Sequence, residues 1–132
     1  ELSVSLHSAK DEVRSKLVPV NKKYPLDELI KACKSYIERT GRIITFEYIL
    51  ISGVNVSKDD ALALVKLLKG IKCKVNTISC NKVAAVSACQ PGAGSIKEFL
   101  NMLRESGVNV LHRKSKGEDI DAGCGQLRIS RL

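Results

Sequence analysis

Strand-like and helix-like segments alternate along this chain, and this alternation limits its fold more than any other feature. The segment 43–51 is rich in β-branched residues and almost continuously apolar, as expected of a parallel strand covered on both faces. Shorter strand patterns over 2–7, 73–80 and 108–112 are separated by longer helical patterns. The alternation predicts βαβ units in an α/β fold with a mostly parallel sheet. The spacing fits an open doubly wound sheet and a slice of a (β/α) barrel equally well.

Helix boundaries are indicated by capping signals. A Ser with an acidic residue three positions later predicts a capping box at the start of three helices; these pairs are Ser8 with Asp11, Ser57 with Asp60, and Ser95 with Glu98. The remaining helix follows Pro25 and buries Leu26, Leu29, Ile30, Cys33 and Ile37 on one face. Gly41, Gly70 and Gly107 are expected to end three of the helices.

Composition narrows the class of protein. The chain has 132 residues, with 44% hydrophobic and 27% charged residues, which is a globular balance rather than a disordered or membrane-spanning one. The net charge of +8 favours polyanionic partners, nucleic acid above all, although a merely soluble basic surface remains an alternative. An aromatic content of 4% argues against a base-stacking platform. With no signal peptide in view, we expect a cytoplasmic protein that does not contact the membrane.

The chain has five cysteines, and their spacing is irregular. Neither C-x-x-C nor C-x-x-x-C-x-x-C occurs, so we expect no disulfide framework and no metal or iron–sulfur site made wholly within this chain. Cys33 lies on an apolar helix face and is predicted to be core. Cys73, Cys80 and Cys89 are assigned no role.

The tail, residues 113–132, holds the most unusual cysteine. Gly123 and Gly125 remove side-chain bulk on both sides of Cys124, which would let a ligand approach the thiol closely. Local chemistry leaves two interpretations, a buried structural cysteine or a reactive thiol favoured as thiolate by nearby cations. The cations Arg113, Lys114 and Lys116 fit a phosphate clamp and a solvated face about equally.

Several segments together carry a resemblance to a known family. They are Ser5-Leu6-His7, residues 10–14, 17–26 and 41–48, Gly53-Val-Asn55, Val75-Asn76, and Gly117-Glu-Asp-Ile-Asp-Ala-Gly-Cys-Gly-Gln-Leu127. In this order they resemble the radical S-adenosylmethionine RNA methyltransferases that modify C2 of adenosine. The resemblance extends from the first residue to about Arg128, and the last segment is its most specific part.

The resemblance implies a fold and a reaction. The fold would be the carboxyl-terminal portion of a partial (β/α)6 barrel, with S-adenosylmethionine and a [4Fe–4S] cluster as cofactors. The cluster ligands would lie upstream, in a C-x-x-x-C-x-x-C loop that this chain lacks. Cys124 would be methylated first and would then pass the carbon to adenine by radical chemistry, because C2 of adenine is electrophilic and cannot attack a sulfonium methyl directly.

The resemblance also implies the site residues. Ser5, Leu6, His7 and Asn81 match positions that contact S-adenosylmethionine, and Cys124 matches the methyl carrier. Taken alone, His7 fits a core or helix-capping histidine equally well, Ser5 an inward strand hydroxyl, and Asn81 a turn asparagine. The segment 82–89 departs from the proline-rich stretch usual in the family, in the loop that would shape the cofactor or RNA pocket.

Further expectations concern the whole protein. A chain that opens at Glu1 inside a strand pattern is predicted to be a single-domain fragment, residues 1–132, and to be inert by itself. The expected substrate is ribosomal RNA, with transfer RNA as a second candidate, and a redox partner and a monomeric state are also expected. A C8-specific relative and a non-catalytic basic RNA-binding module remain alternatives.

Overall fold

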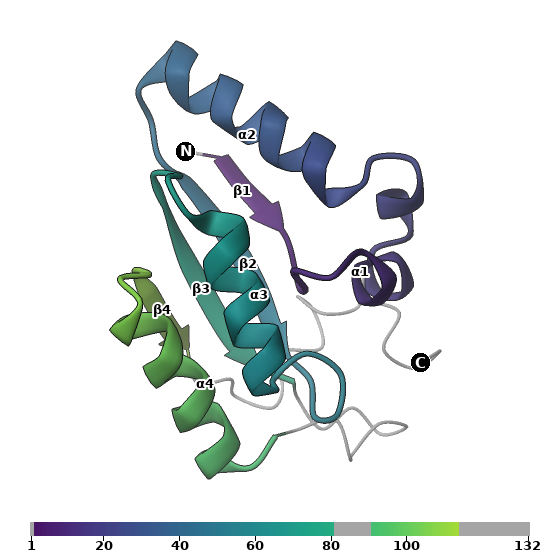
Figure 1. Cartoon of the computed structure of the whole chain (residues 1–132), viewed down its shortest axis with the longest axis vertical. Coiled ribbons are helices and arrows are strands. Elements are labelled where there is room, and N and C mark those ends of the chain that lie inside the picture. Colours follow the sequence, from purple (N-terminus) through teal and green to yellow (C-terminus); the bar gives the residue numbers. More distant parts are fainter. Residues whose placement is uncertain (1, 81–90, 114–132) are drawn as a thin grey trace.

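A computed structural model describes residues 2–80 and 91–113 of the chain. Within them the elements alternate as predicted (Figure 1). In chain order they are β1 (Leu2–Ser5), α1 (Asp11–Leu17), the 3-10 helix η1 (Pro19–Lys22), α2 (Leu26–Thr40), β2 (Ile44–Leu50), α3 (Lys58–Leu68), β3 (Cys73–Ser79), α4 (Ala93–Glu105) and β4 (Val110–Arg113).

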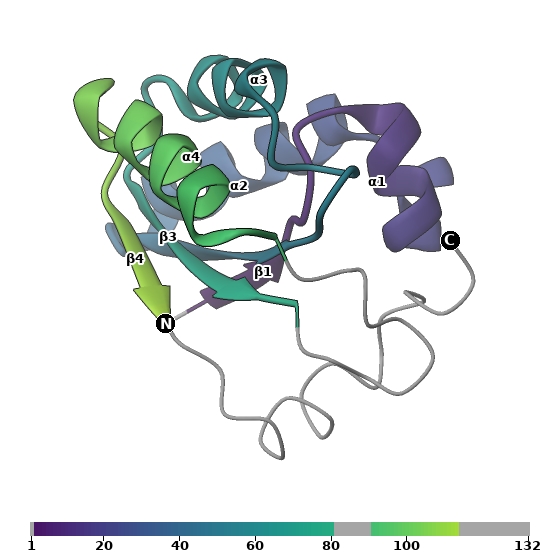
Figure 2. The ribbon, with the colours of Figure 1, turned by 90° about the horizontal axis from the view of Figure 1, so that it is seen from below.

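The described strands form one parallel sheet, in the order β1-β2-β3-β4. A doubly wound sheet reverses its strand order at one point and places helices on both faces. No reversal occurs among these strands, and α2, α3 and α4 lie on the same face of the sheet (Figure 2). The arrangement is therefore that of a barrel slice, which resolves the alternative that the spacing had left open.

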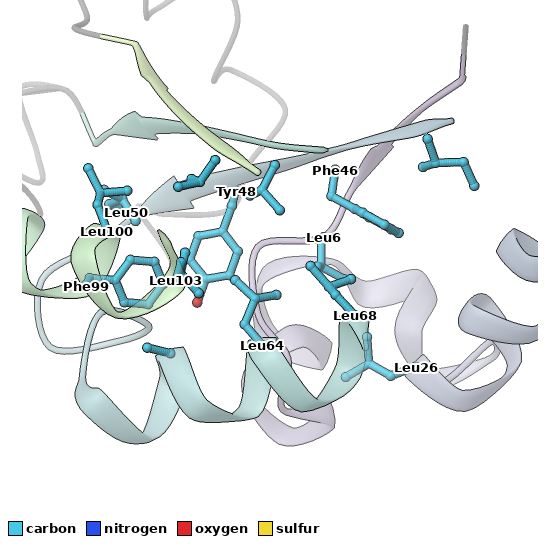
Figure 3. Close-up of a cluster of buried hydrophobic side chains, with 14 of the residues drawn as sticks. Leu6, Leu26, Phe46, Tyr48, Leu50, Leu64, Leu68, Phe99, Leu100 and Leu103 are labelled. Carbon is cyan, nitrogen blue, oxygen red and sulfur yellow. The ribbon is translucent and has the colours of Figure 1, made fainter. Parts of the chain in front are cut away.

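The main core lies between the sheet and these helices. Alternate residues of β2 and β3 point to it, including Phe46, Tyr48 and Val75, each 0% exposed. Figure 3 shows the side chains that meet them from the helices, among them Leu64, Phe99 and Leu103. We call this side of the sheet the helix face and the opposite side the inner face.

A smaller apolar cluster covers the inner face where the strands end. Leu17 of α1 packs there with Ile49, Ile51 and Cys80, each no more than 2% exposed. β2 is thus covered on both faces near its carboxyl end, as its apolar sequence predicted. Nearer the middle of the strand, Glu47 interrupts this cover and is only partly buried.

The capping predictions had mixed outcomes. The Ser57–Asp60 box is confirmed, with both reciprocal bonds present. The Ser8–Asp11 box is wrong, because the Ser8 hydroxyl accepts the Lys10 N–H instead, at 3.0 Å. The Ser95–Glu98 box is also wrong, because α4 begins at Ala93 and Ser95 therefore lies inside the helix.

Two further findings concern Cys33 and the membrane. Cys33 is 3% exposed in the main core, which confirms its prediction. No helix within the described residues is long and apolar enough to cross a membrane.

Candidate functional site

The candidate site begins where β1 leaves the sheet. The N–H groups of Leu6 and His7 both donate to the carbonyl oxygen of Glu47, at 2.9 and 3.3 Å. The Ser8 N–H then donates to the Leu6 carbonyl at 2.8 Å, which closes a tight γ-turn around His7. His7 has a φ of +59°, and among the described residues it is the one non-glycine residue with a positive φ. Such strain persists only where the surroundings hold it in place, and it is concentrated at functional sites.

The His7 imidazole takes part in holding that turn. Its Nδ1 atom accepts the Ile49 N–H at 3.0 Å, so in the neutral ring the proton lies on Nε2. Burial, together with the smaller effect of the nearby Arg14 cation, lowers the pKa of His7 from 6.5 to about 4. At neutral pH the side chain is therefore an uncharged imidazole of fixed tautomer.

Asn55 fixes the same region from the other side. Its Nδ2 donates to the carbonyl oxygens of His7 and Ile49, both at 2.7 Å, and its Oδ1 accepts the Ile51 N–H at 2.8 Å. Its own carbonyl accepts the Tyr48 hydroxyl at 2.7 Å. Both backbone groups of Ile49 thus bond to side chains, where a continuing β1 would have supplied backbone partners. Asn55 is 0% exposed, so these bonds form away from water.

Arg14 of α1 holds the two residues that precede His7. Its Nε donates to the Leu6 carbonyl at 3.0 Å and its Nη2 to the Ser5 carbonyl at 2.9 Å. Its Nη1 donates to Asn21 Oδ1 at 2.8 Å, and Asn21 Nδ2 in turn reaches Asp11 Oδ1 at 3.2 Å. Arg14 is buried, and this network places three of the five N–H donors of its guanidinium on protein acceptors.

A polar row crosses the inner face at the same level. Ser5, Glu47 and Asn76 are register partners on β1, β2 and β3, so their side chains share one face of the sheet. Asn76 Nδ2 donates to Glu47 Oε2 at 3.2 Å. Asn76 Oδ1 is buried and has no hydrogen-bond partner in the described part of the chain.

Some of the predicted site residues come together here. Ser5 lies exposed at the end of β1, and His7, 6% exposed, follows it in the γ-turn. Leu6 lies between them with a side chain that is 0% exposed in the main core, so only its backbone belongs to the turn. Asn81, Cys124, Lys114 and Lys116 lie outside the described residues.

The cysteines of the described segments divide into two kinds. Cys33 and Cys73 are free, and burial raises the pKa of both thiols, that of Cys73 to about 11. Cys80 is engaged in a disulfide bond, which the irregular spacing did not predict. The described segments contain no group of three or more His, Cys, Asp or Glu side chains that could hold a metal ion.

Comparison with known proteins places this geometry in context. No family model matches the chain. A probable dual-specificity RNA methyltransferase RlmN from Alkaliphilus oremlandii is 49% identical to it over 131 residues, which is 99% of this chain and 38% of the relative. A protein of the same name from Thermoanaerobacter sp. (strain X514) is 46% identical over 131 residues, again 99% of this chain and 38% of the relative.

A solved radical SAM methyltransferase from Sphaerobacter thermophilus superimposes with a TM-score of 0.88 at 47% identity, covering 98% of this chain and 38% of that one. The chain resembles radical SAM RNA methyltransferases. This finding confirms the family resemblance seen in the sequence and the predicted α/β fold class with its mostly parallel sheet. The chain spans 38% of the length of the curated relatives named above.

A more distant structure supports the fold alone. A domain of pyruvate-formate lyase-activating enzyme from Bacteroides vulgatus has a TM-score of 0.67 at 14% identity, covering 85% of this chain and 66% of that domain. The strand order and the single helix layer are thus shared with a protein of very different sequence.

Three residues of the site, Asn55, Glu47 and Asn76, were not assigned a role from the sequence. Asn55 was noted only as part of a resembling motif, although its side chain bonds three backbone groups, at His7, Ile49 and Ile51. The Glu47–Asn76 pair carried a weak signal, because each is a polar residue inside an otherwise strand-like pattern. Their pairing depends on the register of β2 with β3, which the sequence does not reveal.

Proposed function

We propose that this chain is part of a radical S-adenosylmethionine methyltransferase that methylates C2 of an adenosine in 23S ribosomal RNA, with transfer RNA as a second substrate. The observation that carries the proposal is identity of 46–49% to probable dual-specificity RNA methyltransferases along 99% of this chain. The clamped turn at Ser5-Leu6-His7 supports it, because strain held by buried hydrogen bonds is expected at a site that must stay fixed for chemistry.

The described residues fit S-adenosylmethionine as a ligand. Ser5 offers an exposed hydroxyl, Glu47 a partly buried carboxylate, and Asn76 an acceptor atom without a partner. S-adenosylmethionine bears hydroxyl and amino groups that such acceptors bind. We therefore propose Ser5, the Leu6 backbone and His7 as cofactor contacts, with Asn81 as a further contact from the segment that follows β3.

Each residue has a defined task in this proposal. Arg14 and Asn55 keep the carbonyls of Ser5, Leu6 and His7 turned into the protein, so that the turn presents a rigid surface to the cofactor. His7 stays neutral and keeps its Nε2 proton at physiological pH. Cys124 carries the methyl group as a thioether before its transfer to RNA.

The cofactors would supply the rest of the chemistry. When bound, S-adenosylmethionine and a [4Fe–4S] cluster supply the methyl group and the radical that the reaction needs. The described residues offer no ligand set for a cluster, so its ligands would come from another part of the protein. We therefore propose that the 132-residue chain is inert by itself, and that a redox partner reduces the cluster in the whole cytoplasmic enzyme.

Intact-mass analysis and peptide mapping of the full-length protein, purified with its cluster, test the role of Cys124. We expect a methyl group on Cys124 and no RNA methylation by Cys124→Ala. Cys73→Ala is the matched control and should retain activity, because Cys73 is a partly buried thiol with no assigned role. Full activity of Cys124→Ala would overturn the mechanism.

The modified base is identified separately. Digestion of the RNA product to nucleosides and mass spectrometry against standards should yield 2-methyladenosine. Recovery of 8-methyladenosine would refute the C2 assignment, and binding of RNA without any methylation would favour a non-catalytic RNA-binding module.

A further inference from the structure

The polar row on the inner face contains more than the turn requires. Ser5 is followed across the sheet by Glu47 and then by Asn76, each the direct register partner of the one before. Neighbouring strands are about 4.8 Å apart, so the row spans roughly 10 Å. That length matches a nucleoside, and one small ligand could touch all three side chains.

The orientation of the Asn76 amide is set by its neighbour. Its Nδ2 faces Glu47 Oε2 at 3.2 Å, and the reverse orientation would place two acceptor oxygens against each other. Oδ1 therefore points away from the carboxylate. It is buried with no partner within the described residues, whereas buried polar atoms are nearly always hydrogen-bonded.

The described helices leave the residues of this row at least partly exposed on the inner face, although Asn76 Oδ1 itself is buried. Helices α2, α3 and α4 cover the helix face, as Figure 2 shows, and α1 packs beside the carboxyl ends of the strands. On the inner face Ser3 and Ser5 of β1 are exposed, and Leu111 of β4, the register partner of Asn76, is 52% exposed.

We propose that the Glu47 carboxylate and Asn76 Oδ1 form a hydrogen-bond-accepting subsite for the adenosine moiety of S-adenosylmethionine. The inference rests on the proposed function, since Ser5 in the same row is proposed to contact that cofactor. A carboxylate accepts up to about four hydrogen bonds and the Asn76 amide uses one of them here. The subsite thus binds a group that offers at least two donors, which the ribose hydroxyls and the exocyclic amine of adenosine both do.

A purely structural role makes a different prediction for the pair. If the pair only linked β2 to β3, the hydrogen bond from Asn76 Nδ2 to Glu47 would be sufficient. A buried Oδ1 acceptor without a partner would add nothing to the stability of that link. Under that role, removing Asn76 would change stability but would leave the affinity for cofactor unchanged.

Calorimetric titration of the full-length protein with its cluster tests the subsite. Two probes are used, S-adenosylmethionine and 5′-methylthioadenosine, which keeps the adenosine moiety but lacks the amino acid. Asn76→Leu should weaken both by about tenfold or more, through loss of one to two hydrogen bonds, and Glu47→Gln should weaken both in the same direction. Asn109→Leu, at an exposed asparagine in the loop before β4, is the matched control and should bind as wild type.

The outcomes separate the inference from the function beneath it. Wild-type affinity in both Asn76→Leu and Glu47→Gln would overturn the subsite, as would a loss for S-adenosylmethionine alone. A loss of affinity for substrate RNA, with both small probes unaffected, would also overturn it. If the wild-type protein bound neither probe and methylated no RNA, the proposed function itself would fail. Far-ultraviolet circular dichroism checks each variant for folding, and Glu47→Gln keeps the inference testable if Asn76→Leu does not fold.

Discussion

Replacement of Asn55 by alanine should destabilise the protein more than most single substitutions. The change removes three hydrogen bonds of 2.7–2.8 Å and leaves the Ile51 N–H and the carbonyls of His7 and Ile49 without these partners in a site that is 0% exposed. Each buried group left unsatisfied costs about 1–3 kcal/mol. Allowing for relaxation, we expect a loss of about 3–6 kcal/mol, a large share of the roughly 5–15 kcal/mol typical of a folded domain.

Urea denaturation followed by circular dichroism measures this loss. With a slope of about 1–3 kcal/mol per molar urea, the midpoint should fall by more than about 1 M. Asn55→Asp keeps the acceptor for the Ile51 N–H but sets a carboxylate against two carbonyl oxygens, so it should be at least as unstable as Asn55→Ala. Asn109→Ala, the exposed control, should stay within about 0.5 kcal/mol of wild type. A loss of less than about 1 kcal/mol for Asn55→Ala would show that Asn55 does not hold the turn.

Three further predictions concern the neighbours of the turn. His7→Asn keeps an acceptor near the position of Nδ1, and asparagine tolerates a positive φ, so its free energy of unfolding should lie within about 1 kcal/mol of wild type. His7→Leu should lose about 2–3 kcal/mol in the same urea assay. Equal losses in the two variants would contradict the role given to Nδ1. The pKa of His7 is lowered from 6.5 in the unfolded chain to about 4 in the fold. The contribution of the neutral imidazole to the free energy of unfolding should therefore be fully present above about pH 6.5 and should be lost as the pH falls through 4, by roughly 3 kcal/mol in all. Urea titrations from pH 7 to pH 4 check this, and a similar decline in His7→Asn would assign the effect to other groups. Arg14→Lys cannot reach the Ser5 and Leu6 carbonyls and Asn21 together, so thermal unfolding should reveal a loss of about 2–4 kcal/mol, and an unchanged melting temperature would refute the clamp.

Local sequence signals predicted the elements well and their first residues less well. The pattern Ser-x-x-Asp occurs at both Ser8 and Ser57, yet only Ser57 forms the box. At the earlier site the Asp11 carboxylate instead accepts from Asn21 Nδ2 and from the Leu26 N–H, at 3.2 and 2.9 Å. Both partners come from more distant parts of the chain, so a signal that depends on nearby residues could not anticipate them.

Strand order was beyond the reach of sequence spacing for a related reason. Connections between strands have similar lengths in a doubly wound sheet and in a barrel, so the repeat of strand and helix fits both. The deciding fact is on which side each helix crosses. Because connections between parallel strands are right-handed, that side depends on the edge of the sheet to which the next strand is added, and the burial of β2 on both faces gives no sign of it. The covering of its inner face by Leu17 of α1 made the two faces look alike in the sequence.

The site itself follows from the early end of β1. Once β1 stops at Ser5, the backbone of Ile49 in the next strand loses its neighbour, and the side chains of His7 and Asn55 take the place of the missing strand. The two residues lie 48 positions apart in the chain, so no local pattern joins them. These side chains let β1 end early while both backbone groups of Ile49 stay hydrogen-bonded. Asn76, in the middle of the neighbouring strand β3, differs in this respect, because among the described residues its Oδ1 is a buried acceptor without a partner; together with the Glu47 carboxylate it is what the proposed subsite would offer to a bound nucleoside.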